Sequence, residues 1–245
     1  MAGAPLPLAG TFHEISVTAA DVRAAVEFYE RLGLTQASTT DTFNHPYGVV
    51  SDGRLCLGVH GRSGPSPVLT FVRPSIARHL GAFDAAGIEL STCRIGEEVF
   101  NEVGFTDPFG HAVAVLEART YSPVARALSE TSLCGDFAFY SLPATDFAAA
   151  QAFWEPLGFV AAGEAREPYV SLELTSDHLD IAFHAPRVCP RPMIVFRDPG
   201  MRARLARLRE LGVEVSAPPP GLPAAANARL DGPEGTVLLL LEGEN

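Results

Sequence analysis

The chain has 245 residues, 47% hydrophobic and 19% charged, which suits two packed domains or one large one. Its formal net charge of −11 argues against nucleic-acid binding, because neutralising phosphates requires a basic surface. No apolar run approaches the ~20 residues that cross a bilayer, and the N-terminus lacks the pattern of a signal peptide. The four cysteines are scattered without a CxxC spacing. We therefore expect a cytoplasmic protein with neither membrane nor nucleic-acid partners.

The first predicted elements are a short strand, EISVT, and a helix over DVRAAVEFYERLGL (21–34). Asp21 is placed as the N-cap, and Val22, Val26 and Tyr29 recur at helical spacing. Gly33 is placed to end the helix in a left-handed conformation. Strand-like segments fill the chain from there to about residue 62. The order of this first unit is therefore predicted to be βαβββ.

The same pattern returns along the chain. A shift of 54 residues carries Gly33 onto Gly87, and a shift of 125 carries Asp21 onto Asp146 and Gly33 onto Gly158. Ser75 and Asp146 hold the N-cap positions of the second and third helices. The chain is thus predicted to contain four βαβββ units, with a connector that includes a short helix at 119–135. The units are 12–62, 67–118, 136–186 and 192–243.

A tight turn precedes the last strand of the second unit, DPFG at 107–110, and of the fourth, GPEG at 232–235. A helix with the pattern D-x-x-x-x-x-x-F-Y-x-x-L-G, followed by D-P-x-G and an apolar strand, resembles the vicinal oxygen chelate superfamily. That superfamily includes glyoxalase I, extradiol dioxygenases, fosfomycin-resistance enzymes and bleomycin-binding proteins. The resemblance covers essentially the whole chain. It implies an α+β fold in which the four units pair into two cup-shaped, glyoxalase-like domains, 1–118 and 136–245, joined by 119–135.

The resemblance also implies a divalent metal in a cup, held by His, Glu or Gln side chains on the first and last strands of each unit. The matching positions are Glu14, Leu57, Val68 and Ala114 in the first cup, and Phe139, Ile181, Met193 and Leu239 in the second. Only Glu14 has a side chain that binds metals, whereas a catalytic metal needs about three protein ligands. We therefore expect no metal and no other cofactor. A non-standard site among the scattered histidines stays open as an alternative.

The first cup offers the polar groups that could contact a ligand. Glu14 and Ser16 are predicted to share one face of the first strand, where burial should raise the pKa of Glu14. Glu14 would then act as a general acid or base or as the counter-charge of a cation, unless it pairs with an arginine at the rim. Phe43, His45 and Tyr47 suit a planar ligand.

The second cup is predicted to be apolar. Arg197, near the end of MIVFR, is its only charge, and serves either as a ligand contact or as part of a salt bridge at the rim.

These features lead first to a metal-free binding protein for an apolar, aromatic or amphipathic small molecule, with a cationic one among the options. Its role would be sequestration or self-resistance. The alternative is a metal-independent isomerase, cyclase or lyase of specialised metabolism that uses Glu14 as general acid or base. The third hypothesis is a pseudo-enzyme scaffold. Monomer and homodimer are both compatible with the sequence.

Overall fold

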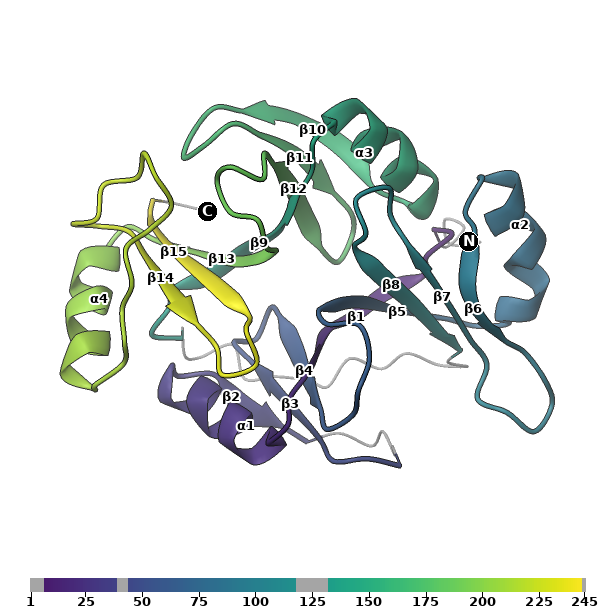
Figure 1. The fold of residues 1–245 in the computed structure, drawn as a ribbon, viewed down its shortest axis with the longest axis horizontal. Coiled ribbons are helices and arrows are strands. Elements are labelled where there is room, and N and C mark those ends of the chain that lie inside the picture. Colours follow the sequence, from purple (N-terminus) through teal and green to yellow (C-terminus); the bar gives the residue numbers. More distant parts are fainter. Residues whose placement is uncertain (1–6, 39–43, 118–131, 244–245) are drawn as a thin grey trace, which may run out of the picture.

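The computed structural model of the chain describes residues 7–38, 44–117 and 132–243. Two mixed sheets dominate it, with the four α-helices at the periphery of the molecule (Figure 1). This arrangement confirms the predicted α+β fold of paired βαβββ modules. The connector helix predicted within 119–135 falls largely outside the described residues, as does Phe43, so both stay predictions.

The first sheet has eight strands in the order β2-β3-β4-β1-β5-β8-β7-β6. Its first module contains β1 (Thr11–Thr18), α1 (Val22–Arg31), β2 (Thr35–Ala37), β3 (Tyr47–Ser51) and β4 (Cys56–His60). Its second module contains β5 (Val68–Arg73), the 3-10 turn η1 (Ile76–His79), α2 (Leu80–Ala85), β6 (Leu90–Arg94), β7 (Glu102–Thr106) and β8 (Ala112–Glu117). The modules join where β1 pairs with β5 in antiparallel fashion.

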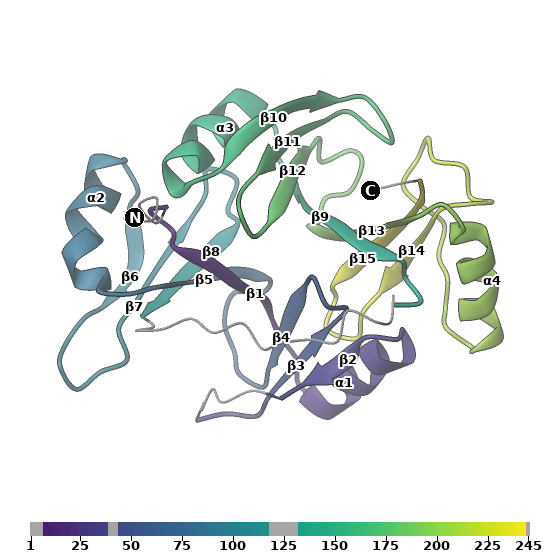
Figure 2. The same ribbon diagram turned by 180° about the vertical axis from the view of Figure 1, so that it is seen from behind.

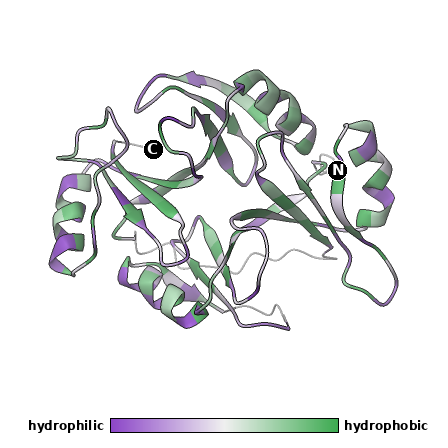
Figure 3. Cartoon of the chain, in the orientation of Figure 1, coloured by the Kyte–Doolittle hydropathy of each residue, from purple (hydrophilic) through white to green (hydrophobic). Residues whose placement is uncertain are grey.

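The second sheet has seven strands in the order β10-β11-β12-β9-β13-β15-β14. Its first half contains β9 (Asp136–Pro143), α3 (Phe147–Trp154), η2 (Glu155–Leu157), β10 (Val160–Ala165), β11 (Ser171–Thr175) and β12 (Asp180–His184). Its second half contains β13 (Met193–Asp198), α4 (Met201–Glu210), β14 (Ala228–Asp231) and β15 (Val237–Glu242). Strand β15 is hydrophobic up to its last residue, Glu242, whereas α4 carries hydrophilic residues (Figure 3).

The fourth module has one strand fewer than the pattern. Residues between α4 and β14 contribute an isolated bridge, Ser216 to Arg229, and the segment continues into APPPG (217–221). Three consecutive prolines lack the N–H groups that a strand donates to its neighbour, so this segment cannot extend the sheet.

Two of the three predicted N-caps are confirmed. The side chain of Asp21 accepts from the Ala24 N–H at 2.9 Å, and that of Asp146 accepts from the Ala149 N–H at 3.0 Å. Ser75 does occupy the predicted N-cap position, but its backbone is left-handed (φ 56°) and its side chain makes no cap bond. The chain there enters a 3-10 turn before the short α2.

The two domains contact each other through matching elements. The Leu133 N–H donates to the Leu32 carbonyl at 2.8 Å, and the Ala9 N–H donates to the Leu157 carbonyl at 3.4 Å. The two donors lie just before β9 and β1, the first strands of their own domains. The two acceptors, Leu32 and Leu157, lie at the end of the first helical segment of the opposite domain. The duplication seen in the sequence therefore builds an interface with approximate twofold symmetry.

The first helix of each domain also contacts the last hairpin of the other. Tyr29 on α1 donates a hydrogen bond to Glu234 in the β14–β15 turn, and Trp154 on α3 donates to Asp107 in the β7–β8 turn at 3.3 Å. Both views show α1 beside the β14–β15 hairpin and α3 beside the β7–β8 hairpin (Figures 1 and 2). Tyr29 and Trp154 are fully buried in one hydrophobic core that includes residues of both domains.

No helix in the described part of the chain is long and apolar enough to cross a membrane.

Candidate functional site

The candidate site lies on one face of the first sheet. We call it the first-cup face and define it by six side-chain positions on four adjacent strands, which are Glu14, Ser16, Gly58, His60, Thr70 and Ala114. Strand pairing places them together, since Glu14 is level with Thr70, Thr70 with Ala114, and Ser16 with Gly58. Residues that pair across strands share a face of the sheet.

Glu14 is at the centre of a buried polar cluster, with only 2% of its surface exposed. Its Oε1 accepts from Ser16 Oγ at 2.7 Å and lies 2.8 Å from His60 Nε2. Its Oε2 accepts from the Tyr47 hydroxyl at 2.6 Å, and the His13 ring lies 3.9 Å away. The cluster therefore directs three hydrogen bonds at one carboxylate, and they come from a serine, a histidine and a tyrosine.

The expected rise in the pKa of Glu14 is corrected by this geometry. Burial by itself raises the pKa of Glu14, but the hydrogen bond from His60, the positive field of His13 and the hydrogen bonds from Ser16 and Tyr47 outweigh it. The pKa of Glu14 consequently lies below its ordinary value. Glu14 is an ionised carboxylate at neutral pH, which suits a counter-charge better than a protonated acid.

A second histidine extends the cluster toward solvent. His45, which is half-buried, places Nε2 at 3.0 Å from Nδ1 of the buried His60. A carboxylate can only accept hydrogen bonds, so with His60 neutral its Nε2 donates to Glu14 and its Nδ1 accepts from His45. Partial burial, together with the charges of His60 and Arg62, lowers the pKa of His45, which favours the neutral form of His45. The chain His45–His60–Glu14 thus links the buried carboxylate to the rim.

Sequence reasoning left His60 among the scattered histidines and missed this contact. The signal that could have found it is strand register: His60 lies two residues beyond Gly58, and Gly58 is level with Ser16. Gly58 is also needed for space, since a Cβ there would lie 2.2 Å from the Glu14 carboxylate atoms.

The register of two expected positions is also corrected. Leu57 is level with Ile15 and belongs to the core on the opposite face of the sheet from Glu14. Ile181 is level with Tyr140 and has the corresponding place in the second domain. The positions that face the cups on these strands are Gly58 and Ala182, because side chains alternate between the two faces of a strand.

Beside the polar cluster, the first-cup face is apolar and accessible. Val68, Ala112, Ala114 and Leu116 are all half-buried, whereas Thr70 between them is buried. Thr70 Oγ1 lies 2.7 Å from Ser16 Oγ and so joins this apolar row to the Glu14 cluster.

The second-cup face is filled by its own side chains. It carries Phe139 at the position of Glu14, Val195 at that of Thr70 and Leu239 at that of Ala114, all three on one level of the sheet. These residues and Met193 form a separate hydrophobic cluster, against which Val188 and Leu222 pack. Leu239, Val195 and Met193 have no exposed surface.

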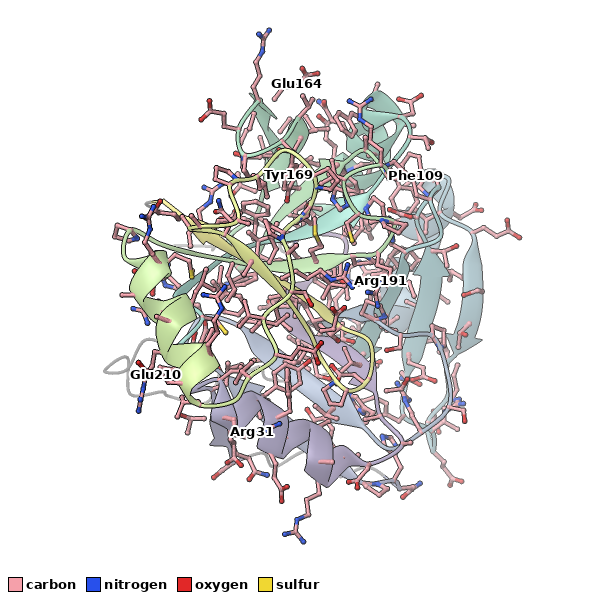
Figure 4. The ribbon with its side chains drawn as sticks, turned by 60° about the vertical axis from the view of Figure 1, so that its left-hand side comes forward. Arg31, Phe109, Glu164, Tyr169, Arg191 and Glu210 are labelled. Atoms are coloured by element: carbon pink, nitrogen blue, oxygen red, sulfur yellow. The ribbon has the colours of Figure 1, made fainter. Side chains whose placement is uncertain are left out.

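His184 occupies the place in the second domain that His60 has in the first. Its Nδ1 accepts from the Ser141 hydroxyl at 2.7 Å, and its Nε2 donates to the Cys189 carbonyl at 2.9 Å. Both side chains are fully buried, and burial lowers the pKa of His184 to about 4. Tyr169, which lies in the second domain in Figure 4, closes the group with its hydroxyl 3.3 Å from Ser141 Oγ. This pair is a neutral, internally satisfied part of the core.

The side chains of the first cup differ from the ligand set of the divalent metal that the family resemblance implies. At the positions where the first cup would supply ligands, Glu14 is accompanied only by Gly58, Val68 and Ala114, none of which has a side chain that binds a metal. Within residues 7–38, 44–117 and 132–243, no group of three His, Cys, Asp or Glu side chains is arranged to hold a metal ion. The residues present therefore do not fit the metal centre of the family.

The architecture matches solved structures throughout its length. Homoprotocatechuate 2,3-dioxygenase from Brevibacterium fuscum superposes with a TM-score of 0.62 and 14% identity, over 99% of this chain and 83% of that one. For 2,2',3-trihydroxybiphenyl 1,2-dioxygenase from Sphingomonas wittichii RW1 the TM-score is 0.61 and the identity 16%, over 95% and 90% of the two chains. The chain has the vicinal oxygen chelate fold.

A Mn(II)-bound glyoxalase from Novosphingobium aromaticivorans shares this fold, with a TM-score of 0.59 and 15% identity over 94% of this chain and 79% of that one. At these identities the likeness establishes the fold and leaves the activity open. No protein-family model matches the sequence, and no curated protein matches it.

Proposed function

We propose that the chain binds a small aromatic or amphipathic molecule on the first-cup face without a metal, with an ionised Glu14 as the counter-charge of a cationic ligand group. The observation that carries the proposal is the buried Glu14 carboxylate one strand from Thr70 and two from the half-exposed Ala114. Neighbouring strands lie ~4.8 Å apart, so a ligand resting on this apolar row lies within the field of the carboxylate.

The surroundings of Glu14 support a cation over an anion as its partner. Glu14 accepts three hydrogen bonds, and two carboxylate oxygens offer about four acceptor positions. The nearby Tyr47 ring adds an aromatic surface of the kind that attracts cations. An anionic ligand would be repelled by the same carboxylate.

The proposal is tested by calorimetric titration, in the presence of a metal chelator, with benzylamine, its trimethylammonium analogue and the neutral benzyl alcohol. We expect the two cations to bind and Glu14→Gln to weaken them about tenfold, with little change for the alcohol. Glu164→Gln, at an exposed position on β10, is the control. Equal binding of the cations to the wild type and to Glu14→Gln would contradict the proposal. The absence of binding by all three probes would favour the scaffold hypothesis.

A second candidate function, metal-independent acid–base catalysis, is favoured by the chain His45–His60–Glu14. Such a chain can take up a proton at the rim while the buried carboxylate stabilises the imidazolium that forms. This second hypothesis is tested by measuring turnover of a ligand that is found to bind in the calorimetric titrations. Catalysis requires that Glu14→Gln or His60→Gln abolish turnover while the ligand still binds. Unchanged turnover in both variants would remove the chain from any mechanism.

A further inference from the structure

A cavity lies outside the Glu14 cluster, at one end of the second-cup face. Its volume is about 600 Å³, within the range of small-molecule sites. The β3–β4 turn of the first domain meets β9 at this point, where the Phe137 N–H donates to Asp52 Oδ2 at 3.3 Å. The cavity is thus formed by both domains, and none of the residues that define the first-cup face lines it.

Two arginines line this cavity. Arg197, half-buried on β13, places its guanidinium carbon 5.1 Å from the centroid of the Phe139 ring. Arg54, from the β3–β4 turn, lines the same cavity. The sequence left Arg197 open between a rim salt bridge and a ligand contact. Among the described residues no carboxylate lies within 4.0 Å of its guanidinium, so this structure contains no such salt bridge. A guanidinium has five N–H donors and needs acceptors for them.

The cavity also has acidic side chains. Glu173, Asp177 and Asp180 line it, and all three belong to the β11–β12 hairpin. Asp180 accepts a hydrogen bond from Thr175 at 2.6 Å, whereas the Glu173 carboxylate has no hydrogen bond within the part of the chain that the structure describes. The strand order β11-β12-β9-β13 puts Phe139, on β9, between the acidic hairpin and Arg197. Positive and negative charges are therefore separated across one aromatic floor.

We propose that this cavity binds an amphoteric aromatic molecule, with its anionic group at Arg197 and Arg54 and its ammonium group at the β11–β12 carboxylates. Its ring would lie against Phe139. A simple anion would gain the arginines but face three carboxylates, and a simple cation would face the arginines. Only a ligand with both charges, held apart by a flat apolar body, complements both sets of side chains. This site is independent of the first-cup proposal.

The probes for the test are 4-(aminomethyl)benzoate, which carries both charges, 4-methylbenzoate and 4-methylbenzylamine. We expect calorimetry to show that the amphoteric probe binds about tenfold more tightly than either singly charged one. Arg197→Gln should remove about tenfold of its affinity and Glu173→Gln a similar factor. The affinity of 4-methylbenzoate should fall in Arg197→Gln, and in Glu173→Gln it should stay the same or rise, because that variant removes a repelling charge.

Two further variants separate a lost site from a damaged fold. Arg54→Gln changes an exposed lining residue and should weaken the amphoteric probe, while Arg209→Gln, exposed on α4, should leave it unchanged. Glu14→Gln should also leave it unchanged, which distinguishes this site from the first-cup face. The proposal is overturned if the amphoteric probe binds no tighter than the other two, or if its affinity is the same in wild type, Arg197→Gln and Arg54→Gln.

Discussion

At the scale of the residue, the two cups differ most clearly at one pair of equivalent positions. Glu14 and Phe139 occupy equivalent places 125 residues apart, and each is matched by its surroundings. Glu14 has Gly58 beside it, which leaves room for the carboxylate, whereas the equivalent place near Phe139 is taken by Ala182. Ser16 and His60 both direct hydrogen bonds toward Glu14. In the second domain Ser141 bonds to His184, and His184 donates to the Cys189 carbonyl.

Because the folded protein lowers the pKa of Glu14, this residue stabilises the fold only where the carboxylate is ionised. An unfolded glutamate titrates near ~4.3, so the contribution is complete above that pH and is lost as the pH falls through the lower pKa of the folded state. We expect Glu14→Gln to lower the unfolding free energy by about 1–3 kcal/mol at pH 7. Urea titrations should show this difference shrinking below pH ~4.

The control for this prediction is Glu164→Gln, whose side chain projects outward from β10 (Figure 4) and which should change the unfolding free energy little at either pH. A destabilisation by Glu14→Gln that is constant from neutral to acid pH would show that the carboxylate is protonated in the folded protein.

At the scale of the element, the D-P-x-G turn connects the domains as well as shaping its hairpin. Asp107 Oδ1 accepts from the N–H groups of Phe109 and His111, both at 2.9 Å, while its Oδ2 accepts from Trp154 of the other domain. The sequence predicted the turn and the helical spacing of Tyr29, to which Trp154 corresponds after a shift of 125 residues, since both follow from local patterns. It did not predict that the turn and Trp154 bond to each other, because this contact joins positions 47 residues apart through tertiary structure.

Asp107→Asn isolates that contact. The asparagine carbonyl can still accept from the turn, but its NH₂ group faces the Trp154 N–H, donor against donor. We expect a loss of about 1–3 kcal/mol in unfolding free energy, because a buried donor is left without an acceptor. Trp154→Phe removes that donor, so the double variant should lose less than the sum of the single losses by about 0.5–1.5 kcal/mol. Strictly additive losses in urea unfolding would show that the bond does not couple the domains.

At the scale of the whole molecule, one duplicated domain has kept an accessible sheet face, whereas the other has filled the middle of its face and keeps a cavity only at one end. Repeats and turns predicted the paired modules, and the family resemblance implied that Ala114 and Leu239 stand where a metal ligand would. They could not predict which cup is filled, because this depends on segments that pack over the second-cup face, such as those carrying Val188 and Leu222. Nor could they place His60 beside Glu14, which required the pairing of β1 with β4.

This asymmetry predicts that reciprocal substitutions at the two equivalent positions differ in their effects on stability and on ligand binding. Leu239 is fully buried, so Leu239→Ala should leave a cavity and cost about 2–5 kcal/mol in unfolding free energy. Ala114 is half-buried next to Gly104, so the larger side chain of Ala114→Leu has space and should cost less than about 1.5 kcal/mol. It should also weaken benzylamine binding on the first-cup face, which Leu239→Ala should leave unchanged once the protein is folded. Urea unfolding and calorimetry on the two variants measure both effects, and equal destabilisation by the two substitutions would mean that both cups are packed alike.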